Sequence, residues 1–128
     1  MKASELMIGD WVRNDFGENQ QIVEIRQDCV MLAYNDTFSL GKIEPIPLTS
    51  EILEKNGFER TGDGWECCES KTLSLVIHEL EEDETCFDIW IAEPMDWKHL
   101  TYSLPLPKYV HELQHSLRLC GIDKTIEL

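Results

Sequence analysis

QIVEIR, residues 21–26, largely alternates polar and apolar side chains, which favours a strand with one buried face. Turn-forming residues flank this run at 16–19 (FGEN) and 27–28 (QD). Further short β-rich runs lie beyond those turns, at 10–14, 29–34, 37–40 and 43–46. Strands this short, with turns this close together, predict a small antiparallel barrel in the first 48 residues.

The opening of this region also indicates a fold type. Ile8-Gly9-Asp10-Trp11-Val12 and the tight meander that follows resemble an SH3-like barrel. This resemblance concerns the fold and implies no function. We therefore predict two units, an SH3-like antiparallel β-barrel at 1–48 and an α+β unit at 49–128. The predicted fold class of the whole chain is α+β.

A short helix with both ends marked in the sequence opens the second unit at 49–58 (TSEILEKNGF). Thr49 or Ser50 can accept hydrogen bonds from the first free backbone N–H groups of the helix. Gly57 fits the left-handed position just after the helix, where Phe58 can fold back on the last turn.

The rest of the second unit is predicted to be an antiparallel meander followed by a C-terminal helix. The predicted strands are residues 65–69, 72–80, 86–91 and 99–104. The helix begins near Pro107, because proline suits the first helical position, and it runs to residue 120. Its apolar side chains form one stripe, which we expect to bury against the sheet: Val110, Leu113, Leu117 and Cys120.

Acidic side chains dominate the charge of the chain. The formal net charge is −14, and residues 59–96 alone hold 12 acidic and 2 basic side chains. Such a field repels phosphate backbones, so direct nucleic-acid binding is not expected, whereas a basic protein partner or simple solubility fits it. Glu79 with the acidic run 81–84 can bind a hard cation or form a solvated hairpin tip, and it lacks the spacing of a calcium loop.

Two further features concern the cellular compartment. The chain has no apolar run of about 18 or more residues and no signal-like pattern at its beginning, so we expect neither membrane insertion nor secretion. Its five cysteines are irregularly spaced, which favours free thiols in a reducing cytosol over a structural zinc site or a disulfide framework. A cytoplasmic protein is therefore expected.

One stretch of the C-terminal helix matches a catalytic motif. The sequence His111-Glu112-Leu113-Gln114-His115 is H-E-x-x-H. Two histidines one helical turn apart can bind one zinc ion, and the glutamate can act as a base on a metal-bound water. This interpretation predicts a zinc-dependent hydrolase with His111 and His115 as metal ligands and Glu112 as the catalytic base.

A catalytic zinc also needs a third protein ligand, and the sequence marks no position for it. The candidates after the motif are Cys120, Asp123 and Glu127, and His78 or His99 can supply a ligand from upstream. The two motif histidines lie opposite the apolar stripe, on a side of the helix that can line a cleft or face solvent. The other interpretation is therefore an ordinary exposed helix with no metal, cofactor or catalytic residue.

Three segments resemble a family of small proteins of unassigned function from gut bacteria and their phages and mobile elements. They are MKASEL with IGDWV at 1–12, IEPIPLT with ILEKNGF at 43–58, and KYVH with LQ at 108–114. The resemblance spans most of the chain and is weakest in the middle meander. It implies a cytoplasmic accessory protein and brings no activity. Members often carry residues unable to perform the chemistry at the positions of Glu112 and His115.

The function expected from the sequence is a non-enzymatic protein-interaction or accessory module of phage or mobile-element origin. The lack of a complete catalytic site and the acidic central third favour this hypothesis. The alternative is a zinc-dependent hydrolase, which the motif at 111–115 favours.

Overall fold

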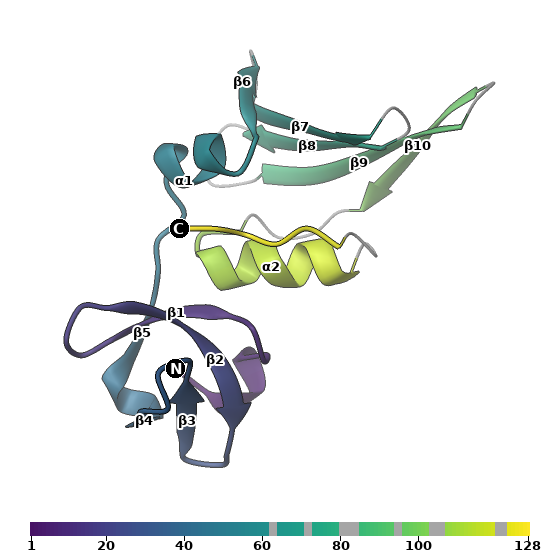
Figure 1. Cartoon of the computed structure of the whole chain (residues 1–128). Coiled ribbons are helices and arrows are strands. Elements are labelled where there is room, and N and C mark those ends of the chain that lie inside the picture. The colour runs from purple at the N-terminus through teal and green to yellow at the C-terminus, as the bar shows by residue number, and fades with distance from the viewer. Residues whose placement is uncertain (62–63, 71–72, 80–84, 94–95, 103–106, 120–122) are drawn as a thin grey trace. The chain divides into compact units, whose positions relative to one another are not determined.

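The computed structural model of the chain describes residues 1–61, 64–70, 73–79, 85–93, 96–102, 107–119 and 123–128. These residues form two five-stranded antiparallel sheets and two α-helices, so the predicted α+β class is confirmed (Figure 1). Residues 1–48 and 107–125 make one compact unit, here called unit 1. Residues 49–106 and 126–128 make the other, unit 2. In the described ranges, no helix has the length and apolar character needed to cross a membrane.

Unit 1 is built on a sheet with the strand order β4-β3-β2-β1-β5. After β4, a 3-10 turn returns the chain as β5 to the open edge of β1. Strands β4 and β5 remain the two edges, so the described residues form no closed barrel and the predicted SH3-like barrel is not confirmed. The elements are η1 (Ala3–Glu5), β1 (Trp11–Asn14), β2 (Asn19–Ile25), β3 (Cys29–Leu32), β4 (Thr37–Ser39), η2 (Leu40–Lys42) and β5 (Ile43–Pro45).

A β-bulge in β2 modifies the alternation predicted for residues 21–26. The register with β3 shifts between Ile22 and Glu24, which makes Val23 the extra residue. Ile22 and Ile25 are three residues apart and would face opposite sides of a regular strand, but the bulge lets both pack on the core while Val23 is exposed. The buried core cluster consists of Leu6, Val12, Ile22, Val30, Leu32, Phe38 and Ile43.

The C-terminal helix α2 (Val110–Leu119) belongs to unit 1. The segment before it pairs with the chain that leaves β5: Val110 N donates to Ile46 O, and Leu48 N donates to Lys108 O, both at 2.9 Å. We predicted that this helix would belong to the second unit, residues 49–128. In the structure, the chain again divides between residues 48 and 49, but residues 107–125 group with the first 48 residues through these long-range backbone bonds.

Unit 2 carries the antiparallel meander, with the strand order β10-β9-β8-β7-β6. The strands predicted from residue 65 onward are present as β7 to β10, although the last begins at Asp96 rather than His99. The predicted acidic tip at 81–84 lies outside the described residues. The elements are α1 (Ser50–Lys55), β6 (Glu59–Thr61), β7 (Gly64–Ser70), β8 (Leu73–Glu79), β9 (Thr85–Glu93) and β10 (Asp96–Tyr102).

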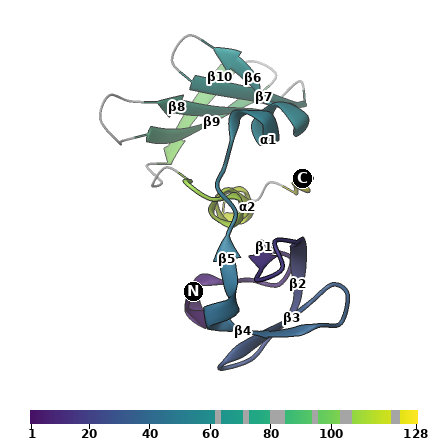
Figure 2. The same cartoon turned by 90° about the vertical axis from the view of Figure 1, so that its left-hand side faces the viewer.

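Both ends of α1 form as the sequence predicts. Thr49 is the N-cap, and its hydroxyl accepts a hydrogen bond from Ile52 N at 3.3 Å. Gly57 has φ +85°, and Phe58 N donates to Leu53 O at 3.0 Å, which closes the helix as expected. The helix lies beside the β6 and β7 end of its own sheet (Figure 2).

Candidate functional site

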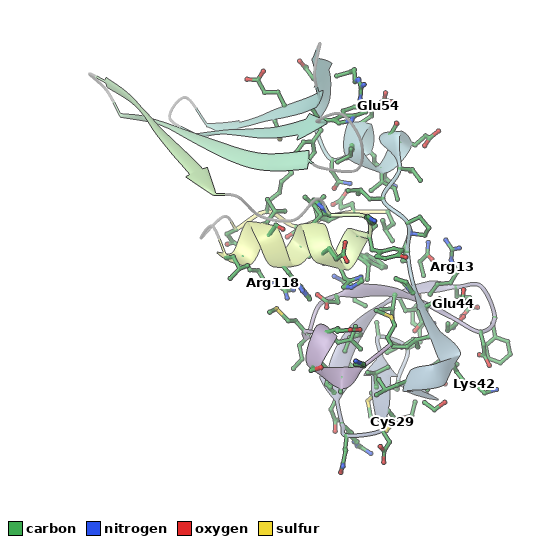
Figure 3. The ribbon with its side chains drawn as sticks, turned by 180° about the vertical axis from the view of Figure 1, so that it is seen from behind. Arg13, Cys29, Lys42, Glu44, Glu54 and Arg118 are labelled. Atoms are coloured by element: carbon green, nitrogen blue, oxygen red, sulfur yellow. The ribbon has the colours of Figure 1, made fainter. Side chains whose placement is uncertain are left out.

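The motif residues lie on α2, and one face of this helix is polar. His111, Gln114, His115 and Arg118 have the spacing i, i+3, i+4, i+7, which aligns their side chains along that face. This face meets the segment 8–11, the turn that leads into β1 of the same unit. In Figure 3, Arg118 extends from α2 toward this part of unit 1.

Asp10 is the centre of these contacts. Its carboxylate is fully buried, with 0% exposure. His115 Nε2 lies 2.7 Å from one carboxylate oxygen, Arg118 donates to the other at 3.4 Å, and Met7 N donates to the first at 2.7 Å. A buried carboxylate loses its hydration, and these three donors replace it. An ionised carboxylate can only accept a hydrogen bond, so the tautomer of His115 with a proton on Nε2 is the one that suits this contact.

Gln114 and Arg118 hold the backbone around Asp10. The Gln114 amide accepts from Trp11 N and donates to Gly9 O, both at 2.9 Å. This side chain therefore pairs with the segment in the way a neighbouring strand would. Arg118 also donates to Ile8 O at 3.0 Å. We call this set the clasp: Gln114, His115 and Arg118 of α2 together with residues 8–11.

Glu112 stabilises the start of α2. Its carboxylate accepts from Lys108 N at 2.7 Å and from Tyr109 N at 3.3 Å. Glu112 is the third residue of the helix, and a glutamate there commonly bonds backward to the N-cap backbone. The glutamate of the motif is thus engaged in helix capping.

His111 is the other histidine of the motif, and it is 6% exposed. It stacks on Tyr109, with ring centroids 5.9 Å apart, and meets His115 edge-on at 5.5 Å. Its Nδ1 atom is buried and has no hydrogen-bond partner among the residues that the structure describes. Burial lowers the pKa of His111 below its ordinary value of 6.5, and the nearby Asp10 carboxylate opposes this shift only in part.

The three motif side chains line one pocket in unit 1. Its volume is about 450 Å³. Two carboxylates and two imidazoles share its wall with Met1, Pro45 and Tyr109, so the wall is about as apolar as it is polar. The lining residues are Met1, Glu5, Pro45, Tyr109, His111, Glu112 and His115. The sequence left open whether this side of the helix lines a recess or faces solvent, and in the structure it lines a recess.

The described residues do not complete a zinc site. Among them, no three or more His, Cys, Asp or Glu side chains are grouped so that they could hold a metal ion. A carboxylate on one ring nitrogen of a histidine leaves the other for a metal, so the Asp10 contact is compatible with either role of His115. Glu112 is engaged in helix capping, and a catalytic zinc would need a third protein ligand from outside the described residues. The side chains of His78, His99 and Cys120 lie outside the described residues.

The motif was visible in the sequence, but the contacts that its helix makes were not. The roles of Asp10, Gln114 and Arg118 in these contacts were not predicted. Two signals were present: a lone carboxylate between the apolar residues of IGDWV, and the regular spacing of polar residues along α2. Neither signal pairs the two segments, because they lie about 100 residues apart.

Comparisons with known proteins do not assign this chain to a family. No protein-family model, curated protein or solved structure matches this chain.

Proposed function

We propose that this protein is a non-enzymatic protein-interaction module, of the accessory kind found in phages and mobile elements, and that its partner is a basic protein. In this proposal the H-E-x-x-H residues serve the fold of unit 1 and not a reaction. The small curled sheet, whether or not it is SH3-like, is the scaffold that presents the interaction surface.

One observation carries the proposal: two of the three chemistry-bearing side chains of the motif, Glu112 and His115, are already engaged within unit 1. Glu112 caps α2 through two backbone N–H groups, and His115 is bound to the buried Asp10. A general base must be available to the proton it removes, and the Glu112 carboxylate already accepts from two backbone N–H groups.

The charge supports a basic partner. The chain carries a net charge of −14, and the excess is greatest in residues 59–96. Complementary charge speeds the encounter of two proteins and disfavours partners of the same sign. The same negative field opposes direct contact with a nucleic-acid backbone.

The decisive experiment is the zinc content of the purified full chain, grown in zinc-replete medium and kept free of chelator. We expect less than about 0.1 zinc per chain, since a catalytic zinc site binds tightly enough to survive purification. His111→Leu serves as the matched variant. About one zinc per wild-type chain that is absent from His111→Leu would overturn the proposal and establish the zinc-hydrolase alternative.

A further inference from the structure

Two aromatic side chains stand out on the surface of unit 1. Phe16 is 78% exposed and Tyr34 is 74% exposed, the largest fractions among the large hydrophobic side chains of the described residues. Phe16 lies in the turn between β1 and β2, and Tyr34 lies in the turn between β3 and β4. Aromatic surface left in water is unfavourable and is stabilised when a partner covers it.

The two turns lie at the same end of the sheet, because alternate turns of an antiparallel meander do so. Gln20 connects them. Its amide oxygen accepts from Tyr34 N at 3.5 Å, and its amide nitrogen donates to Glu18 at 3.1 Å. Phe16 and Tyr34 therefore belong to one local surface although they are 18 positions apart in the chain.

The first turn is held in a defined conformation. The Asn14 side-chain oxygen accepts from Phe16 N at 3.0 Å and from Glu18 N at 2.9 Å. The Phe16 ring packs edge-on against Phe38 of β4, with ring centroids 6.2 Å apart. A ring that is fixed before binding loses little conformational entropy when a partner covers it.

Acidic residues neighbour both aromatic residues in the sequence. Asp15 and Glu18 flank Phe16, and Asp36 lies in the turn of Tyr34. Lys42 contacts Asp15 at 3.2 Å, but this ion pair is exposed and weakly held. Cationic side chains are attracted both to carboxylates and to aromatic faces, so this surface suits arginine and lysine.

We infer that the aromatic end of unit 1, defined as Phe16 and Tyr34 with Asp15, Glu18 and Asp36, is the docking surface for a basic segment of the protein partner. Arginine or lysine side chains of that segment stack on the two rings and pair with the carboxylates. The inference rests on the proposed interaction function and names the surface that performs it.

A labelled peptide of about 12 residues, with four arginines spaced by leucine and glycine, tests this surface. Its binding to the full chain is measured by fluorescence anisotropy, in parallel with the same peptide carrying glutamate in place of arginine. We expect binding of the arginine peptide only. The double variant Phe16→Ser/Tyr34→Ser should weaken it at least about tenfold.

Leu119→Ser is the matched control, because Leu119 is 71% exposed and lies outside the surface. It should bind as the wild type does, and circular dichroism should show that all variants are folded. Equal binding by the wild type and the double variant would mean that net charge alone attracts the peptide. That result would contradict the proposed docking surface but not the proposed interaction function. No binding up to about 1 mM would likewise overturn the surface. The proposed function itself fails on the zinc measurement and not on this one.

Discussion

The side chain of Asp10 joins the turn before β1 to helix α2 within unit 1. The carboxylate is buried and accepts hydrogen bonds from a turn backbone, an imidazole and a guanidinium. Such a group stabilises a fold only when all of its donors are in place, because a buried charge without partners is costly. His115 and Arg118 therefore supply the polar partners that make it possible to bury a carboxylate in the apolar IGDWV segment.

His111 gives the protein a pH-dependent stability whose sign follows from its lowered pKa. As pH falls below about 6.5, the unfolded chain takes up a proton at His111 before the folded chain does. The stability that neutral His111 provides is thus present above pH 6.5 and is lost as pH falls through the folded-state pKa. The charged groups around it are Asp10, Glu112, Glu5 and His115, and the two-histidine contact adds to the loss.

Substitution of His111 tests this. His111→Leu and His111→Gln should both show a flatter dependence of unfolding free energy on pH between about 5 and 7.5 than the wild type, measured by urea denaturation. Only His111→Leu removes the buried polar atom that has no partner among the described residues. At pH 7.5 its unfolding free energy should therefore exceed that of His111→Gln by about 1 kcal/mol. Variants whose pH dependence parallels the wild type would show that His111 does not titrate differently in the folded state.

Gly9 is a second residue on which the clasp depends. It has φ +92°, and a Cβ placed there would lie 3.0 Å from an Arg118 guanidinium nitrogen. Gly17 has φ +82° with no atom within 4 Å of its Cβ position, so it is a matched control for backbone strain. We expect Gly17→Ala to cost about 1 kcal/mol and Gly9→Ala about 1 kcal/mol more, by urea denaturation. Equal losses would mean that Arg118 moves away freely.

At the scale of elements, the hydrogen bonds of Glu112 at the first turn of α2 stabilise the start of this helix. Glu112→Ala should lower the unfolding free energy by about 1 kcal/mol, because Lys108 N and Tyr109 N lose their acceptor. Glu112→Gln keeps an amide oxygen at the same place and should retain most of that stability. Urea denaturation separates the two variants. A wild-type midpoint for Glu112→Ala would show that the capping bonds contribute nothing.

The elements themselves were largely predictable, because their signals are local. The two ends of α1 and the strands other than β6 follow from capping residues, turns and alternation over a few positions. The bulge at Val23 was not predictable, since it depends on how β3 pairs with β2. The grouping of α2 with unit 1 was not predictable either, because it arises from bonds between Ile46 and Val110 that no local pattern encodes.

At the scale of the whole chain, segments far apart in the sequence meet within unit 1. IGDWV contacts α2 through the clasp, and the stretch after β5 pairs with the start of α2. The opening of the chain, the junction near residue 48 and the ending helix thus form one assembly in unit 1. A motif match on α2 alone could not show this, since the meaning of H-E-x-x-H depends on what its side chains contact.

The central claim is that the motif serves the fold through the Asp10 and His115 pair, and a double-mutant cycle tests it most directly. The unfolding free energies of wild type, Asp10→Asn, His115→Gln and the double variant are measured by urea denaturation with a chelator present. The exposed pair of Asp15 and Lys42 is the control, with an expected coupling below about 0.5 kcal/mol. We predict a coupling of at least about 1 kcal/mol between Asp10 and His115. Effects that add within about 0.3 kcal/mol would contradict the claim.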